Sequence, residues 1–132
     1  MKASTKNHSR SISWFGIIGS LAALVHYCVA VSLEGFAHIS PAYSNIAGFV
    51  LAFPVSYFGH SKLSFANHQS SHQEALPKFF VVALVGFIAN QILVLGLMHA
   101  FNLPFWLVLG VVMVIVAVSA YLLSRFWAFK SK

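Results

Sequence analysis

The chain has 132 residues, of which 59% are hydrophobic and 8% are charged, and its formal net charge is +6. So few polar residues cannot cover the surface of a soluble globule of this length, and the composition therefore indicates a membrane protein. All Lys and Arg residues lie in the segments 2–10, 62–78 and 125–132, beside apolar stretches. This placement favours anionic lipid headgroups, and not nucleic acid, as the partner of the positive charge.

Four membrane-spanning helices are predicted, in chain order, from the runs without charged residues. A spanning helix needs about 20 apolar residues, and an uncharged run of this order lies on each side of Glu34. The run from Phe79 to Ser124 is too long for one crossing, and the turn-forming segment 102–104 divides it. The prediction is an all-α membrane protein with one transmembrane domain, 1–132, that contains helices near 14–34, 42–61, 78–101 and 105–125 and a loop at 62–77.

The orientation follows from the basic residues, which mark the cytoplasmic side of a membrane protein. With four helices, all eight Lys and Arg residues fall on one side, whereas the loops at 35–41 and 101–104 contain none. Both termini and the 62–77 loop are therefore predicted to be cytoplasmic. A cleaved signal peptide is a weaker interpretation of the basic start, because the first apolar run exceeds the usual length of such a segment and three more spans follow.

The second half of the sequence weakly repeats the first half. The aligned pairs, which all share one offset, are Phe15 with Phe79, His26 with Asn90, Tyr57 with Tyr121, and Phe65 with Phe129. We interpret the chain as a duplicated helical hairpin. Because each hairpin enters from the cytoplasm, the two are predicted to be parallel repeats related by an axis along the membrane normal.

Each predicted hairpin ends in a segment that mixes aromatic side chains with a cation. The residues of this group are Tyr57, His60 and Lys62 in the first hairpin, Lys78 at the start of the second, and Tyr121, Arg125 and Trp127 at its end. One interpretation is the aromatic belt and the snorkelling cations of membrane interfaces in general. The other is a site that holds a lipid phosphate and stacks on a sugar, since a guanidinium binds phosphate through two parallel hydrogen bonds.

Two polar side chains are predicted near the middle of the membrane, His26 in the first helix and Asn90 in the third. A polar side chain inside a helix bundle commonly forms a hydrogen bond to a neighbouring helix and has no other role. The alternative is that both residues line a polar path for a substrate. The sequence leaves these two interpretations open.

The whole-chain layout resembles the GtrA-like family of small membrane proteins. The features that carry the resemblance are the four-helix length, the Lys78-Phe79 start of the third helix and the two endings that combine aromatic residues with a cation. The resemblance covers residues 13–130. It implies a fold of four transmembrane helices.

The family closes each hairpin with a signature of Asn or His, then Arg, Trp and Phe. The second hairpin keeps this signature as Arg125, Trp127 and Phe129. The first hairpin departs from it, because Ser61 and Leu63 stand where Arg and Trp are usual. His60, Lys62 and Phe65 remain there as candidates for the same role.

The resemblance implies a protein of the bacterial cytoplasmic (inner) membrane that handles polyprenyl-phosphate-linked sugars for cell-surface polysaccharide synthesis or glycosylation. One implied role is flipping of the lipid-linked sugar across the membrane. The alternative is a non-transporting subunit that anchors or regulates a polyprenyl-phosphate glycosyltransferase. In the first role, Lys62, Lys78 and Arg125 capture the phosphate at the cytoplasmic side, and His26 and Asn90 line the path.

We expect neither catalytic residues nor a metal or other cofactor, so the protein is predicted not to be an enzyme. Acid-base and metal catalysis usually use carboxylates, and the chain has Glu34 and Glu74 alone. His68 and His72 have the spacing of a helical metal pair, but neither Cys nor Asp accompanies them. The expected partners are membrane lipids, the lipid-linked sugar, a glycosyltransferase and a second copy of the chain, since four helices enclose little space.

Overall fold

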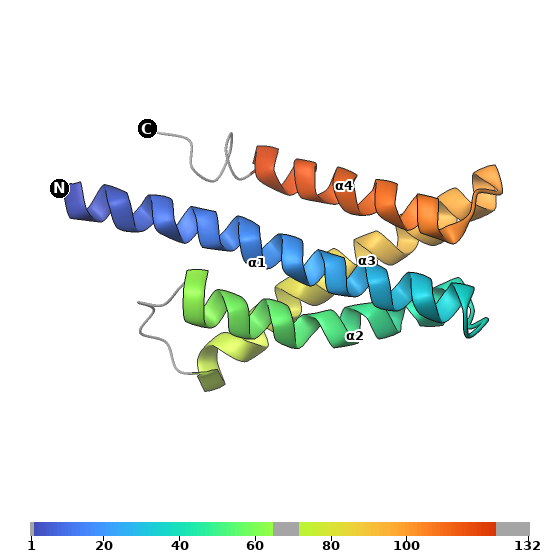
Figure 1. The fold of residues 1–132 in the computed structure, drawn as a ribbon, viewed down its shortest axis with the longest axis horizontal. Helices are drawn as coiled ribbons and strands as arrows, with labels where there is room; N and C mark the ends of the chain where they lie inside the picture. The colour runs from blue at the N-terminus through green and yellow to red at the C-terminus, as the bar shows by residue number, and fades with distance from the viewer. Residues whose placement is uncertain (1, 65–71, 124–132) are drawn as a thin grey trace. The chain divides into compact units, whose positions relative to one another are not determined.

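The computed structural model describes residues 2–64 and 72–123, with the side chains of 13–62 and 76–119 (Figure 1). In chain order the elements are α1 (Lys2–Gly35), α2 (Pro41–Gly59), the π-helical turn η1 (His60–Ser64), α3 (His72–Phe101) and α4 (Phe105–Leu123). The described residues contain no strand. The predicted all-α class with four helices is therefore confirmed.

Two helices begin earlier than the sequence predicts. α1 begins at Lys2 and not near 14, and α3 begins at His72 and not near 78. The predictions placed both starts at the edge of an apolar run, but a helix continues through polar residues where none of them breaks it. Pro77 lies in the second turn of α3, where it removes a single backbone hydrogen bond without ending the helix.

The chain comprises two compact units, Met1–Phe87 and Ile88–Lys132. The boundary falls within α3. The first part of α3 therefore belongs with α1, α2 and η1, and its remainder belongs with α4.

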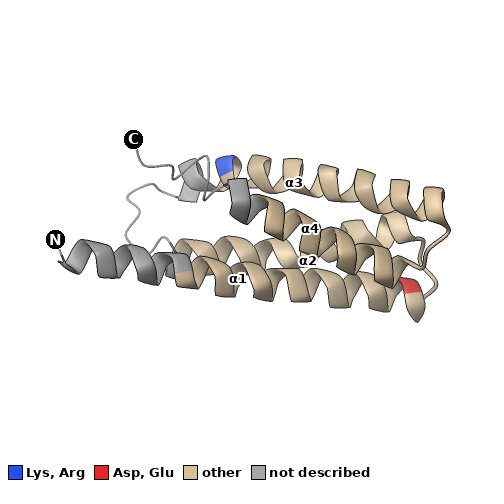
Figure 2. Cartoon of the chain, turned by 90° about the horizontal axis from the view of Figure 1, so that it is seen from above, with Lys and Arg blue, Asp and Glu red and all other residues tan. Residues whose placement is uncertain are grey.

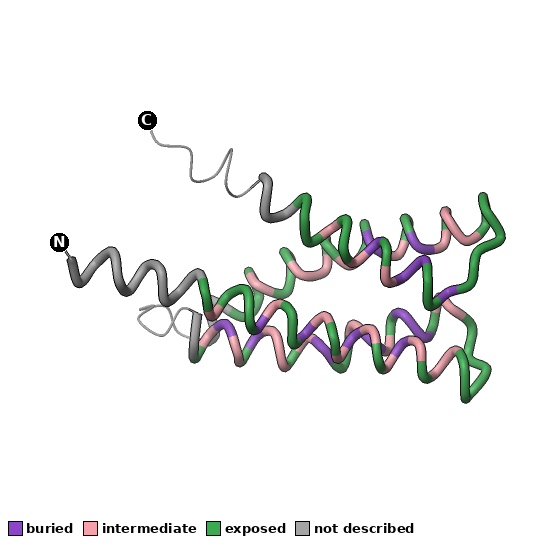
Figure 3. Tube along the Cα trace, turned by 45° about the horizontal axis from the view of Figure 1, so that its top comes forward, coloured by how far each residue is buried: buried purple, intermediate pink, exposed green. Residues whose placement is uncertain are grey.

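In the first unit, many of the residues that are buried along α1 and α2 are small. Figure 3 shows buried positions recurring along α1 and α2. The buried residues are Ile18, Ala22, His26 and Ala30 in α1, and Ser44, Asn45, Gly48, Ala52 and Tyr57 in α2. Small residues let the backbones of two membrane helices approach, which is the usual source of their association in lipid.

Gly48 and Gly59 both lie so close to α1 that an added Cβ atom would meet its atoms. A Cβ atom at Gly48 would lie 2.6 Å from the backbone oxygen of His26, and one at Gly59 would lie 2.6 Å from Ile18 Cγ2. At Gly48 the neighbour is the backbone of α1, so only a residue without a side chain fits there, whereas at Gly59 the neighbour is the Ile18 side chain. Gly48 therefore sets the spacing of the α1–α2 pair.

The turn between α1 and α2 contains His38 in the left-handed region, with φ 57°. The Ser40 side chain caps α2 by accepting a hydrogen bond from the Tyr43 backbone N–H, and Pro41 occupies the first helical position. The Ser44 hydroxyl donates to the Ile39 backbone oxygen at 3.1 Å. The start of α2 is thus fixed by hydrogen bonds within its own turn.

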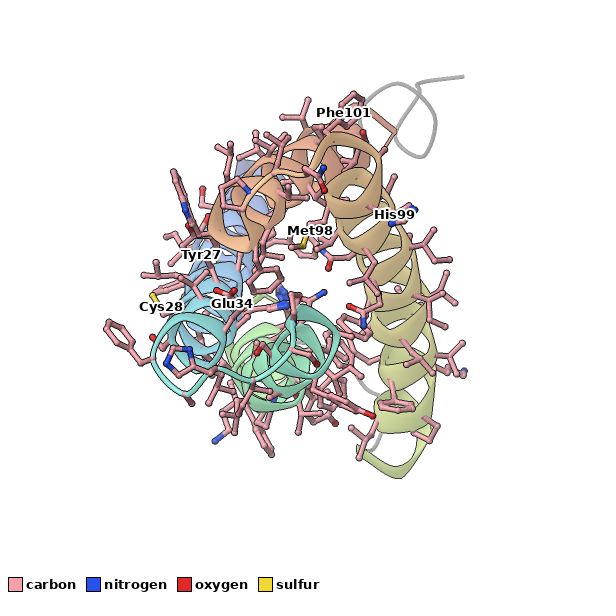
Figure 4. All side chains as sticks on the ribbon, turned by 90° about the vertical axis from the view of Figure 1, so that its right-hand side faces the viewer. Tyr27, Cys28, Glu34, Met98, His99 and Phe101 are labelled. Carbon is pink, nitrogen blue, oxygen red and sulfur yellow. The ribbon has the colours of Figure 1, made fainter. Side chains whose placement is uncertain are left out.

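In the second unit, α4 follows α3 after the segment 102–104, in which Asn102 has φ 53°. The buried residues of this unit are Asn90 and Val94 in α3, and Phe105, Val108, Leu109 and Val112 in α4. Met98 points toward α4, whereas His99 points away from it (Figure 4).

The structure keeps the register of the internal repeat that the sequence shows. α4 (Phe105–Leu123) begins and ends at the positions that the repeat aligns with the two ends of α2 (Pro41–Gly59). The left-handed turn residues His38 and Asn102 are also aligned by the repeat. Buried positions recur as well, in the aligned pairs His26 and Asn90, Ala30 and Val94, Ser44 and Val108, Asn45 and Leu109, and Gly48 and Val112.

The surface of the helices is largely apolar. Ser13–Gly35 and Leu76–Phe101 are long and apolar enough to cross a membrane, and Phe105–Ser119 is a shorter apolar helix. Many large side chains on these helices are exposed, for example Val82, Ile92 and Val114. Cys28 is free and exposed, and it lies on the side of α1 that points away from α2 (Figure 4). Such a surface matches lipid as the solvent.

The described charged side chains of the first unit lie at its two ends. Glu34 is in the last turn of α1, whereas Lys62 follows α2 and Lys78 is near the start of α3. Figure 2 shows a basic residue at the start of α3 and an acidic residue at the opposite end of α1. Between these two ends, the described side chains of the first unit carry no charge.

We predict that Gly48→Val destabilises the protein by about 1–3 kcal/mol, because the added carbons overfill the contact between α1 and α2. The measurement is the unfolding midpoint in mixed detergent micelles, followed by circular dichroism. Gly86→Val is the matched control, since no atom lies within 4 Å of a Cβ built there. Equal losses in the two variants would contradict the prediction.

Candidate functional site

The candidate headgroup site lies at the lysine-bearing end of the first unit, where α2, η1 and the start of α3 meet. The His60 ring lies 4.7 Å from the Phe15 ring and 6.0 Å from the Phe79 ring, measured between centroids. The Tyr57 ring meets Phe79 edge-on at 5.6 Å. We call Phe15, Tyr57, His60 and Phe79 the aromatic cluster.

The two site residues predicted in this cluster are buried. The exposed fraction is 5% for Tyr57 and 6% for His60. Their rings lie against other rings, so the structure places them as packing partners of α1 and α3. An edge-on ring pair contributes about 0.5–1.5 kcal/mol beyond the area that it buries. The cluster therefore joins α1, the end of α2 and the start of α3.

The two predicted cations of this unit are exposed beside the cluster. The Lys62 Nζ atom lies 5.7 Å from the centroid of the Phe58 ring, which is a cation–π distance. Lys78 is the residue before Phe79 and is exposed. Both lysines are thus accessible to an anion, while the Tyr57 and His60 rings of the cluster are buried.

Ring contacts also attach the first part of α3 to the length of α2. Phe49, Phe53 and Tyr57 recur every four residues on one face of α2. The Phe49 ring stacks on Phe87 at 4.6 Å, and the Phe53 ring lies 5.5 Å from Phe80. α3 therefore meets α2 through large side chains, whereas α1 meets it through small ones.

The predicted path residue His26 forms a buried hydrogen bond to a residue that the sequence analysis did not single out. Its Nε2 atom lies 2.7 Å from Asn45 Oδ1, and since that oxygen only accepts, the imidazole donates. Asn45 is fully buried, and the Phe87 ring lies 6.2 Å from the His26 ring. This geometry favours the interhelical role that the sequence left open for His26.

Asn45 could have been noticed as a polar residue in an apolar run. Asn45 lies 4 residues after the start of α2, whereas His26 lies 9 residues before the end of α1, so counting residues from the turn does not pair them. Asn90, the other predicted path residue, is buried in the second unit. Leu109 stands there at the position that matches Asn45.

Several predicted site residues fall beyond what the structure describes. Arg125 and Trp127 lie outside the described residues, as does the side chain of Tyr121. The same holds for His68 and for the side chain of His72, which have the spacing of a metal pair.

The sequence matches the family described as GtrA/DPMS, transmembrane domain, over residues 14–129. The chain belongs to this family. This match covers all four helices, although it begins after the polar first turns of α1. Neither a curated protein nor a solved structure matches the chain. Membership of the GtrA/DPMS family makes this a membrane protein of polysaccharide or lipid-linked sugar handling.

We predict that Asn45→Leu lowers the free energy of unfolding by roughly 1 kcal/mol, the usual contribution of a hydrogen bond between membrane helices. The loss arises because the His26 N–H is left without its acceptor. The measurement is a double-mutant cycle with His26→Phe, each variant being unfolded in mixed micelles. If the two single losses add up fully in the double variant, the bond makes no contribution.

Proposed function

We propose that the protein translocates a polyprenyl-phosphate-linked sugar across the cytoplasmic membrane. The observation that carries the proposal is the match of the GtrA/DPMS transmembrane domain to residues 14–129. It is supported by the exposed Lys62 and Lys78 at one end of an otherwise apolar unit. The phosphate of a lipid is an anion at the membrane surface, where the proposal places these two lysines.

The physical problem in this reaction is the headgroup. Each sugar hydroxyl that enters hydrocarbon without a partner costs a few kcal/mol, and the phosphate costs far more. A protein lowers this barrier by offering hydrogen bonds and charge along the way, while the prenyl tail stays in lipid. In this proposal Lys62 and Lys78 bind the phosphate, and the sequence predicts the same role for Arg125 and a hydrogen bond to the sugar for Asn90.

The aromatic cluster has a supporting part in this proposal. Because Tyr57 and His60 are buried against Phe15 and Phe79, they hold the ends of three elements together beneath the exposed lysines. The distance between the two lysine-bearing segments is then set by ring packing. His26 likewise acts through Asn45, by keeping α1 and α2 paired.

The proposed movement is downhill and needs neither ATP nor protons. Glu34, the acid near the end of α1, lies at the opposite end of the first unit from Lys62 and Lys78. Proton-coupled transporters place an ionisable acid within their helices. Consumption of the lipid-linked sugar on the outer side would then draw the reaction forward. A flipping rate that depends on ATP in purified vesicles would refute this part.

A second candidate function is a non-transporting subunit that anchors or regulates a polyprenyl-phosphate glycosyltransferase. The observation that favours it is that the buried polar side chains already have partners within the protein. Every buried side-chain nitrogen and oxygen among the described residues has a hydrogen-bond partner, including His26 and Asn45. In this role the lysine-bearing end binds the enzyme, and the helices serve as its anchor.

We predict that Lys62→Gln, Lys78→Gln and Arg125→Ala each lower the flipping rate about tenfold, which corresponds to roughly 1.4 kcal/mol of lost binding to the phosphate. The measurement uses purified protein in liposomes with a polyprenyl-phosphate sugar. Lys6→Gln is the control, because it removes the same charge from a residue outside the proposed site.

The same assay separates the two functions. If the wild-type protein flips no more lipid than empty vesicles, while a glycosyltransferase still needs it for activity, the anchoring role replaces transport. Equal rates in all four variants and the wild type would leave the transport and refute the phosphate site.

A further inference from the structure

The Lys62 ammonium group lies over the ring of Phe58, a residue that the sequence analysis did not single out. The distance from Nζ to the ring centroid is 5.7 Å. Phe58 precedes Lys62 by one helical turn and is further from the lysine-bearing end, because α2 runs toward that end and stops at Gly59. A lysine at a membrane surface ordinarily extends its ammonium toward water. The Lys62 ammonium is directed back toward the apolar part of the unit.

The Phe58 ring is attached to the buried part of the fold. It meets the Tyr57 ring edge-on, with 5.2 Å between the centroids and 71° between the planes. Tyr57 is buried in the aromatic cluster, whereas Phe58 is 52% exposed. Phe58 therefore connects a buried ring to an exposed cation.

The ring holds this cation without neutralising it. Among the described side chains the sole acid is Glu34, at the opposite end of the first unit (Figure 2). A carboxylate beside Lys62 would cancel its charge and occupy its N–H groups, which a phosphate would then have to displace. An aromatic ring attracts the ammonium through its negative face and leaves the N–H groups on the other side available. Lys62 thus keeps its full charge for an anion.

Contact with a ring also makes a lysine a better ligand for phosphate. The lysine stem is flexible, and fixing its ammonium on a ligand costs rotamer freedom. A side chain that is already restricted by the Phe58 ring loses less of this freedom when the ligand binds. The ring also keeps the charge near apolar groups, where the dielectric constant is lower and the attraction to an anion is stronger.

We propose that Phe58 is a positioning residue for the lipid phosphate: its ring holds the Lys62 ammonium, with the charge free, where the phosphate of the lipid-linked sugar binds. The proposal rests on the proposed function for its ligand. The chemistry recognised is a phosphate on a lipid tail, and Phe58 acts through Lys62. In this segment the exposed Phe58, and not the buried Tyr57, is the aromatic residue next to the binding group.

The test changes the charge distribution of the ring and keeps its shape. Trifluorophenylalanine at position 58 weakens the negative face that attracts a cation and fills nearly the same volume. Binding of polyprenyl phosphate to the full chain is measured by titration in nanodiscs of a zwitterionic lipid. The matched control is the same fluorination of Phe36, which is exposed and lies at the Glu34 end of the unit.

We expect fluorination of Phe58 to weaken binding about threefold, Phe58→Leu to weaken it as much, and Phe58→Trp to retain it, because Trp attracts cations best. Fluorination of Phe36 should change nothing. In a Lys62→Gln background, fluorination of Phe58 should also have no effect, since the ring then has no cation to hold. An equal loss with and without Lys62 would show that the ring only packs, and would overturn the inference.

Lys62→Gln alone separates this inference from the proposed function. If that variant binds polyprenyl phosphate as the wild type does, the phosphate site fails, and the role of Phe58 fails with it. If it binds about tenfold more weakly while fluorination of Phe58 changes nothing, the site stands and the inference alone is refuted.

A second titration, with phosphatidic acid, places the same phosphate chemistry on a different lipid tail. An equal effect of fluorination at Phe58 there supports a positioning role toward lipid phosphates in general. An effect confined to polyprenyl phosphate supports a role toward the proposed substrate.

Discussion

The close approach of α1 to α2 is the constraint on which the rest of the first unit depends. In hydrocarbon, apolar side chains gain nothing by leaving lipid, so helices associate where their backbones fit together or where polar groups find partners. Gly48 lets the two backbones fit together, and the His26–Asn45 hydrogen bond pairs two buried polar groups. Once this pair is fixed, ring contacts attach η1 and the start of α3 to the end of α2.

At the lysine-bearing end, some residues pack against the fold and their neighbours are available to bind a ligand. Aromatic rings with a polar atom, Tyr57 and His60, are buried, and the cations next to them are exposed. In such a site the buried rings fix the spacing of the lysines, and the lysines themselves do not stabilise the fold. The exposed ammonium groups then remain available for a phosphate or for an acidic surface of a partner enzyme.

The sequence predicts the helices well where a turn residue marks them. Pro41 and the 102–104 segment predict the start of α2, the end of α3 and the start of α4 within one residue. No turn-forming residue lies near 14 or 78, and there the helices continue into the polar flanks. The site is less predictable. Periodicity shows that His26 faces inward, but not that Asn45 lies opposite, because the partner depends on the approach of two backbones. Burial of Tyr57 and His60 likewise comes from the position of Phe79, which sequence spacing alone does not give.

The polar face of α2 has a consequence for how the protein enters the membrane. Ser44 and Asn45 place a hydroxyl and an amide at fully buried positions of α2. A helix with an unpaired amide is costly in hydrocarbon, and the partner of this amide is on α1. We therefore expect α2 to insert together with α1 during synthesis, as a preformed hairpin, whereas the uniformly apolar α4 can leave the translocation channel without waiting for α3.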